Sequence, residues 1–113
     1  MSKDLSISVL MDFYGELLTE KQKDTLDLYY NSDLSLAEIA QDIDISRQGV
    51  RDFIKRGEKQ LLEFEEKLGM VSKYNSIGRE LSLLYDEVMA VKGIDSAKKA
   101  EILKRINSIK SSL

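Results

Sequence analysis

The chain has 113 residues, of which 42% are hydrophobic and 33% charged, and it lacks proline, cysteine, histidine and tryptophan. Without cysteine and histidine, zinc fingers, thiolate nucleophiles, imidazole bases and disulfide frameworks are excluded. The absence of proline favours helix nearly throughout, because proline interrupts helices. No run reaches the ~18 apolar residues of a membrane span. We therefore expect a cytoplasmic, all-α, non-enzymatic protein without a cofactor or metal.

Two helices are predicted in the N-terminal third. The first shows the apolar stripe of an amphipathic helix, formed by Leu10, Phe13, Tyr14, Leu17 and Leu18. Thr19, with Gln22 three residues later, has the spacing of a capping box that begins a second helix. That helix is expected to direct Leu26, Tyr29 and Tyr30 inward and to end at the turn-forming residues 31–33.

A short third helix and a long fourth helix follow. Ser35 and Glu38 form another capping box. The apolar positions after it are Leu36, Ile39, Ala40 and Ile43. Ser46 is the predicted N-cap of the fourth helix, and Gly69 is its predicted C-cap. Glycines inside this helix, such as Gly57, each cost about 1 kcal/mol relative to alanine. Residues 1–69 are therefore expected to form one module of about four helices.

The remaining residues, 70–113, are predicted to form a helical hairpin. The first apolar seam repeats at heptad spacing and comprises Tyr74, Ile77, Leu81, Leu84, Val88 and Val91. Gly93 is expected to end this helix, and Asp95 to cap the next. The last seam comprises Ile102, Ile106, Ile109 and Leu113. We expect this tail to join two copies of the chain into a homodimer. Two alternatives are that its apolar seams pack against the first helices of the same chain, or that its basic residues contact nucleic acid.

Residues 34–62 have the order of a helix-turn-helix. Ala40 supplies the small side chain needed where two helices cross. Asp44 tolerates the positive φ that the turn requires, although glycine would do so better. Ile45 is expected to fill the gap between the helices, and Val50 to face Ala40. Two helices of an ordinary bundle are the plainer alternative, but this combination of features favours the helix-turn-helix.

The first turn of the second helix of this motif carries the predicted DNA contacts. Arg47 or Arg51 could pair with guanine and Gln48 with adenine in the major groove. The Ser46 hydroxyl and the helix N-terminus could hold a phosphate. Further phosphate contacts are assigned to Lys55, Arg56 and Lys59.

The net charge of −3 conceals an uneven distribution. Residues 1–32 carry three basic and six acidic groups, whereas residues 69–113 carry eight basic and five acidic groups. Between them, residues 46–62 hold five basic groups against two acidic ones. The acidic total therefore does not exclude nucleic acid, because binding depends on where the basic groups gather.

The stretch from Asp12 to about Gly69 contains the phrases FYGELLTEKQ, LYYNSDLSLAEIA and ISRQGVRD. Through these it closely resembles the YlxM family of small bacterial helix-turn-helix proteins, and its helix-turn-helix resembles region four of sigma factors. The resemblance implies a DNA-binding protein. It also implies a regulatory role in the signal recognition particle pathway, since members of the family commonly lie genetically beside the particle's GTPase. Asp44 departs from the glycine that is frequent in such turns.

We accordingly expect a DNA-binding regulator that binds the major groove of double-stranded DNA. The alternative is an adaptor that uses the helix-turn-helix to dock on a protein or ribonucleoprotein, such as a partner related to the signal recognition particle. Overall acidity favours the adaptor, and the basic residues after Ser46 favour DNA.

Overall fold

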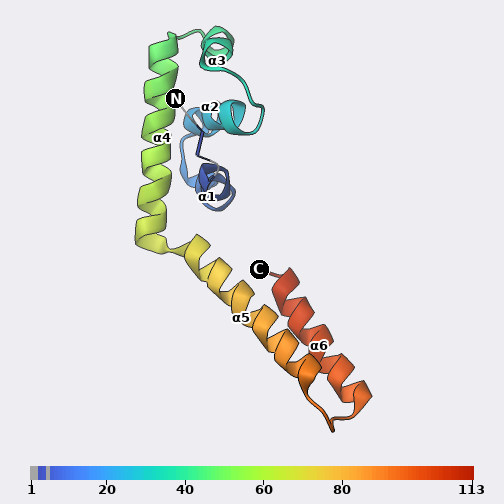
Figure 1. The fold of residues 1–113 in the computed structure, drawn as a ribbon. Coiled ribbons are helices and arrows are strands. Elements are labelled where there is room, and N and C mark those ends of the chain that lie inside the picture. Colours follow the sequence, from blue (N-terminus) through green and yellow to red (C-terminus); the bar gives the residue numbers. More distant parts are fainter. Residues whose placement is uncertain (1–2, 5) are drawn as a thin grey trace. The chain divides into compact units, whose positions relative to one another are not determined.

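The computed structural model describes residues 3–4 and 6–113. The elements are α1 (Ser6–Tyr14), the 3₁₀ turn η1 (Gly15–Leu17), α2 (Glu20–Tyr30), α3 (Leu36–Ile43), α4 (Arg47–Leu68), α5 (Met70–Ala90) and α6 (Ser96–Ser111) (Figure 1). Throughout the described residues the regular structure is helical, so the prediction of an all-α fold is confirmed. The chain divides into two compact units, residues 1–71 and 72–113, which we describe separately.

In the first unit, α4 is the element against which α1, α2 and α3 all pack (Figure 1). Its buried side consists of Val50, Ile54, Gly57 and Leu61, whose three- and four-residue spacing keeps them on one face. The other core residues are Ile7, Leu10, Met11, Tyr14, Leu18, Leu26, Tyr29 and Ile39. A helix of 22 residues is thus held along most of its length by three shorter ones.

The first helix ends earlier than its apolar pattern predicts. It stops at Tyr14, and the chain tightens into the 3₁₀ turn that begins at Gly15. A 3₁₀ turn has three residues per turn instead of 3.6, so the apolar stripe is rotated from that point on. Leu17, expected on the buried stripe, is 58% exposed, whereas Leu18 is buried.

Local capping chemistry fixes the beginnings of α2 and α3. The Thr19 hydroxyl accepts a hydrogen bond from the backbone N–H of Gln22 at 3.2 Å. Ser35 and Glu38 form the full reciprocal box, in which each side chain accepts from the other residue's backbone N–H at 3.1 Å. The turn predicted at residues 31–33 follows α2, where Asp33 adopts a φ of 55°.

Gly57 allows α2 and α4 to approach closely. A Cβ atom at this position would lie 2.8 Å from Cδ1 of Leu26, a fully buried residue of α2. Contacts that short do not occur between carbon atoms, so a side chain here would require Leu26 or the helices themselves to shift. The glycine that weakens α4 as an isolated helix is therefore required by its packing.

A partly buried polar network closes the end of α4 and begins α5. Tyr14, which is fully buried, donates to Oε1 of Glu65 at 2.6 Å, and its hydroxyl oxygen accepts from the backbone N–H of Met70 at 3.0 Å. The same Glu65 oxygen accepts from the N–H of Val71 at 3.0 Å. Gly69, between the helices, has a φ of 62° and is the predicted C-cap of α4. The first orphan donors of α5 are thereby satisfied from α1 and α4.

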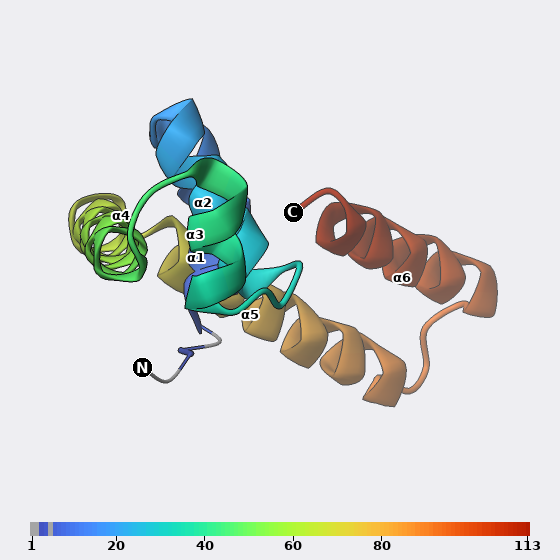
Figure 2. The ribbon, with the colours of Figure 1, turned by 90° about the horizontal axis from the view of Figure 1, so that it is seen from above.

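The second unit is the predicted antiparallel hairpin, in which α6 runs back along α5 (Figure 2). Nζ of Lys110 donates to the Ser82 hydroxyl at 2.8 Å, and Nζ of Lys99 donates to the carbonyl oxygen of Met89 at 2.7 Å. One boundary differs from the prediction, because α5 ends at Ala90 and leaves Val91 outside the helix. Gly93 instead lies within the link, with a φ of 80°.

None of the helices in the described part of the chain is both long and apolar enough to cross a bilayer.

Candidate nucleic-acid interface

The helices α3 and α4 and the turn between them form the predicted helix-turn-helix. Asp44 adopts the left-handed conformation, with φ 56° and ψ 48°, which reverses the chain after α3. The backbone N–H groups of Asp44 and Ile45 both point to the carbonyl oxygen of Ala40. Ser46 then caps α4, since its hydroxyl accepts from the N–H of Gly49 at 3.0 Å. The local sequence alone therefore dictates both the turn and the start of α4.

Apolar packing holds the two helices of the motif together. Ile39 of α3 and Val50 of α4 are fully buried, and Ala40 and Ile45 pack against this core while remaining partly exposed. Gly49 fits closely inside the turn, where an added Cβ would lie 3.1 Å from the Ser46 hydroxyl and 3.6 Å from Ile45. Its small size thus has an intramolecular reason.

The first turn of α4 presents its polar side chains to solvent. Ser46, Arg47, Gln48 and Arg51 are all exposed. A shallow depression of about 330 Å³ lies among Arg47, Gln48, Arg51 and Leu36 of α3. Neither arginine forms an ion pair with any residue that the structure describes, so both guanidinium groups are available to an anionic or base-edge partner.

A cationic row runs along α4 from this turn. Arg47, Arg51, Lys55 and Lys59 are spaced four residues apart, and we call them the α4 cationic row. Residues at this spacing are neighbours on a helix surface and drift about 40° per step around it. All four are exposed. The structure therefore brings four of the five predicted cations into one continuous strip.

The fifth cation, Arg56, lies away from the row. Its guanidinium carbon is 5.5 Å from the centroid of the Phe53 ring, a cation–π geometry on the other flank of α4. Arg56 is exposed but contacts an aromatic side chain instead of continuing the strip. It is the weakest of the predicted phosphate contacts.

One acidic side chain beside the middle of the row, Glu58, is held by contacts within the fold. Glu58 accepts a hydrogen bond of 2.6 Å from the Tyr30 hydroxyl of α2 and lies 3.9 Å from Nζ of Lys55. Its side chain is only 15% exposed. Burial, and then this carboxylate, raise the pKa of Tyr30, so the phenol stays protonated and keeps donating. Tyr30 thereby holds the Glu58 carboxylate against α2.

Two residues that sequence reasoning missed adjoin the predicted DNA contacts. Nε2 of Gln48 donates to Oδ1 of Asp52 at 3.0 Å, which fixes the direction of the Gln48 amide. The four-residue spacing of the pair on a helix was a readable indication of this contact. Leu36 was assigned only to the buried face, yet it is partly exposed and lines the depression with Arg47.

The described residues contain no group of three or more acidic, histidine or cysteine side chains placed to hold a metal ion. What the arrangement offers is a capped helix N-terminus, two unpaired guanidinium groups, an oriented amide and a strip of cations. Helix N-termini and arginines are suited to phosphate oxygens, and arginine and glutamine to base edges.

Comparison with known proteins agrees with this geometry. The family described as "Putative helix-turn-helix protein, YlxM / p13 like", UPF0122, matches residues 1–107, which extends well past the resemblance seen at residues 12–69. A UPF0122 protein of Acetivibrio thermocellus is 49% identical over 111 residues, covering 94% of this chain and 92% of its own. One from Clostridium kluyveri is 44% identical over 108 residues, covering 96% and 95%. Another from Desulforamulus reducens is 44% identical over 106 residues, covering 88% and 89%. The chain belongs to the UPF0122 family of YlxM/p13-like helix-turn-helix proteins.

Proposed function

We propose that this protein is a cytoplasmic DNA-binding regulator that inserts the N-terminal turn of α4 into the major groove. The observation that carries the proposal is the α4 cationic row, which begins at the N-terminus of the second helix of a helix-turn-helix. In such motifs this turn reaches the base edges while the surroundings contact the backbone. Arg47, Gln48 and Arg51 are the proposed base-reading residues.

The other predicted residues are proposed to position the helix on the DNA backbone. The Ser46 oxygen already accepts from Gly49, so its O–H remains free to donate to a phosphate. Lys55 and Lys59 continue the row toward the phosphates, and Arg56 is a peripheral contact. Residues 1–71 carry nine basic and fifteen acidic groups. Because non-specific binding depends on how many phosphates the protein neutralises, and few cations gather at this surface, its affinity should be low and should fall further as salt rises.

We further propose that the protein acts as a homodimer joined through residues 70–113. One helix-turn-helix covers a single half-site, and pairing two of them is the common solution. The resemblance to the YlxM family supports a regulatory role in the signal recognition particle pathway. Loss of the gene should then change expression of the particle's components, as measured by transcript sequencing.

The proposal is tested by selecting duplexes from a random pool with the purified protein and measuring mobility shifts of the enriched sequences. Replacing both Arg47 and Arg51 with alanine should abolish the preference for the enriched sequence. Replacing Lys21 and Lys67, two exposed lysines on α2 and late α4, is the matched control and should preserve it. If no sequence is enriched, or the arginine variant keeps the preference, base reading by this turn is wrong.

The second candidate is an adaptor that docks on a protein or ribonucleoprotein, and the acidity of residues 1–71 favours it. Nuclease-treated lysate separates the two functions. Retention of one defined protein partner, together with no DNA enrichment in chromatin recovery, would favour the adaptor over the regulator.

A further inference from the structure

We propose that the hairpin of α5 and α6 pairs with a second copy of the chain so that α5 of each copy lies against α6 of the other. The inference deepens the homodimer proposed above by naming its surface and symmetry, and it does not depend on DNA binding. It rests on the exposure, the spacing and the edge charges of residues 72–113.

The hairpin leaves many of its apolar side chains exposed. Among the described residues of this unit, Ile106 alone is a buried hydrophobic residue, at 4% exposure. Ile77 and Leu84 of α5 are each 45% exposed, and Ile109 of α6 is 51% exposed. Two helices with so small a common core need further burial to be stable. A partner surface is therefore required by the energetics of this unit.

One row of apolar residues lies on one side of the hairpin, whereas Leu83, at 55% exposure, and Met89, at 51%, are exposed outside that row. Ile102 belongs to the row but is partly buried. Ile102 and Ile109 stand four residues before and three residues after Ile106, which faces α5. Ile77 and Leu84 stand at the same offsets from Leu81, which is partly buried. Because the offsets are equal, the row on each helix is displaced from its seam residue by the same angle and in the same sense about the helix axis.

Because the two helices are antiparallel, rotation in the same sense brings both rows to the same side of the pair. Leu84 and Val91 repeat these offsets about Val88, the next seam residue of α5. We call the resulting surface the hairpin apolar face; it comprises Ile77, Leu84, Val91, Ile102 and Ile109. A groove of about 370 Å³ lies along its α5 side, among Ile77, Leu84 and two carboxylates.

The two edges of this face carry opposite charge. Glu80 and Glu87 stand one turn before Leu84 and Val91, so they border the α5 edge, where Lys73 near the start of α5 is the one cation. Lys98 and Arg105 stand one turn before Ile102 and Ile109 and border the α6 edge.

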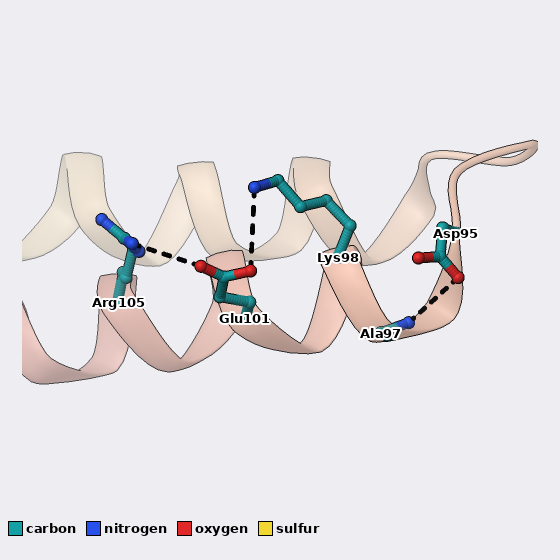
Figure 3. Close-up of polar contacts among 5 residues, drawn as sticks. All are labelled: Asp95, Ala97, Lys98, Glu101 and Arg105. Carbon is teal, nitrogen blue, oxygen red and sulfur yellow. Dashed lines mark hydrogen bonds and ion pairs between the residues drawn. The ribbon is translucent and has the colours of Figure 1, made fainter.

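The α6 edge keeps a positive charge after its internal pairing. The carboxylate of Glu101 lies 3.7 Å from Nζ of Lys98 and 3.2 Å from a guanidinium nitrogen of Arg105, so one anion is shared by two cations (Figure 3). The face therefore has an acidic rim on one side and a basic rim on the other.

This charge pattern selects between two symmetric pairings. A two-fold axis across the helices would place α5 on α5 and bring two acidic edges together. A two-fold axis along the helices places α5 on the other copy's α6, so that each acidic edge meets a basic one. Both arrangements make neighbouring helices antiparallel, as in a four-helix bundle, but only the second is electrostatically complementary.

The contacts within the hairpin set the register of this pairing. The Lys110–Ser82 and Lys99–Met89 hydrogen bonds place Glu87 at about the height of residues 101–105 along the hairpin, where Arg105 is the nearest cation of the basic edge. A two-fold axis parallel to the helices preserves that height. Glu87 should therefore face Arg105 of the partner subunit, twice in the dimer.

Sedimentation velocity of the full-length chain tests the arrangement. The wild-type protein should sediment as a dimer at micromolar concentration. Glu87→Arg and Arg105→Glu should each raise the dissociation constant about tenfold at low salt, and the two changes combined in one chain should restore it. Asp86→Arg and Lys104→Glu, exposed neighbours on the opposite sides of the helices, are matched controls and should leave it unchanged.

Each outcome has a defined meaning when helix content, followed by circular dichroism, is unchanged. A monomeric wild-type chain overturns the pairing itself. A dimer that tolerates Glu87→Arg overturns the α5-on-α6 symmetry while leaving the homodimer intact. In the alternative α5-on-α5 pairing, Glu87 faces another acidic edge and contributes no attraction, so its replacement would not weaken the dimer. The Arg47→Ala, Arg51→Ala variant should still sediment as a dimer. A failure of the proposed pairing can thus be distinguished from a failure of the proposed DNA binding.

Discussion

The hydroxyl of Tyr14 donates a hydrogen bond of 2.6 Å to the carboxylate of Glu65, 51 residues further along the chain. Burial and this carboxylate raise the pKa of Tyr14, so the hydroxyl remains protonated at neutral pH. Both residues also accept from the first backbone N–H groups of α5. The pair therefore serves as a cap for α5 that is supplied from outside that helix.

Replacing Tyr14 with phenylalanine should lower the free energy of unfolding by about 1–3 kcal/mol, because the Glu65 carboxylate and the Met70 N–H both lose a partner. Urea denaturation at neutral pH measures the change. Tyr29→Phe, which deletes the same atom from another buried tyrosine, is the control and should cost less. Equal losses in the two variants would contradict the role assigned to the network.

Gly57→Ala should destabilise the protein by about 1–3 kcal/mol despite the better helix propensity of alanine, because the new methyl group meets Leu26. Gly78→Ala in α5 is the matched control, since nothing lies within 4 Å of its added Cβ. That variant should be more stable by up to about 1 kcal/mol. Thermal unfolding of both chains gives opposite shifts if the close approach of α2 and α4 is real.

Asp44→Gly should stabilise the protein by about 0.5 kcal/mol, because glycine adopts the left-handed turn conformation without steric cost. Asp44→Val should destabilise it by about 1–2 kcal/mol, since β-branched residues are strained there. The midpoints of urea denaturation would give the order Gly, Asp, Val. Any other order would contradict the positive φ at this turn.

Glu38 provides a prediction about acid. The Ser35 backbone N–H, and then its hydroxyl, lower the pKa of Glu38 in the folded state. A carboxyl with a lowered pKa contributes stability above its unfolded pKa of about 4.3, and that contribution is lost as the pH falls through the folded value. The wild-type chain should therefore exceed Glu38→Gln in stability at pH 7, with the difference disappearing in more acidic solution.

Denaturation of both chains as a function of pH measures this difference. Asp42→Asn, at the other end of α3, removes an exposed carboxylate that takes no part in a cap and should give a flatter difference. A gap between wild type and Glu38→Gln that stays constant into acid would exclude the carboxylate as its cause.

Much of the fold could be predicted because its determinants are local. Helix boundaries are recognisable at Ser35, Ser46 and Gly69, because the hydrogen bonds that cap the helices there span only a few residues. Asp44 likewise indicates the turn between α3 and α4. The exposure of Leu17 could not be predicted in this way. The change from α-helix to 3₁₀ turn at Gly15 shifts the side chains by a fraction of a turn, and periodicity does not show where that shift begins.

Interactions between distant residues escaped prediction. The spacing of Arg47, Arg51, Lys55 and Lys59 was readable, but the position of Glu58 depends on Tyr30, which lies 28 residues earlier. Likewise Gly57 appears only as a weak point of its helix until Leu26 is placed beside it. A single sequence contains the residues of such contacts but gives no information on which of them meet.

The continuity of α4 has a mechanical consequence. Its 22 residues span about 33 Å, from Arg47 at the proposed DNA-contacting end to the turn that contains Glu65. A rigid rod of that length amplifies small rotations, so a tilt of about 5° at the Tyr14 end displaces the other end by about 3 Å. That displacement is as long as a hydrogen bond. A change in the packing of the side chains around Tyr14 can therefore shift the position of Arg47, although these residues do not contact Arg47.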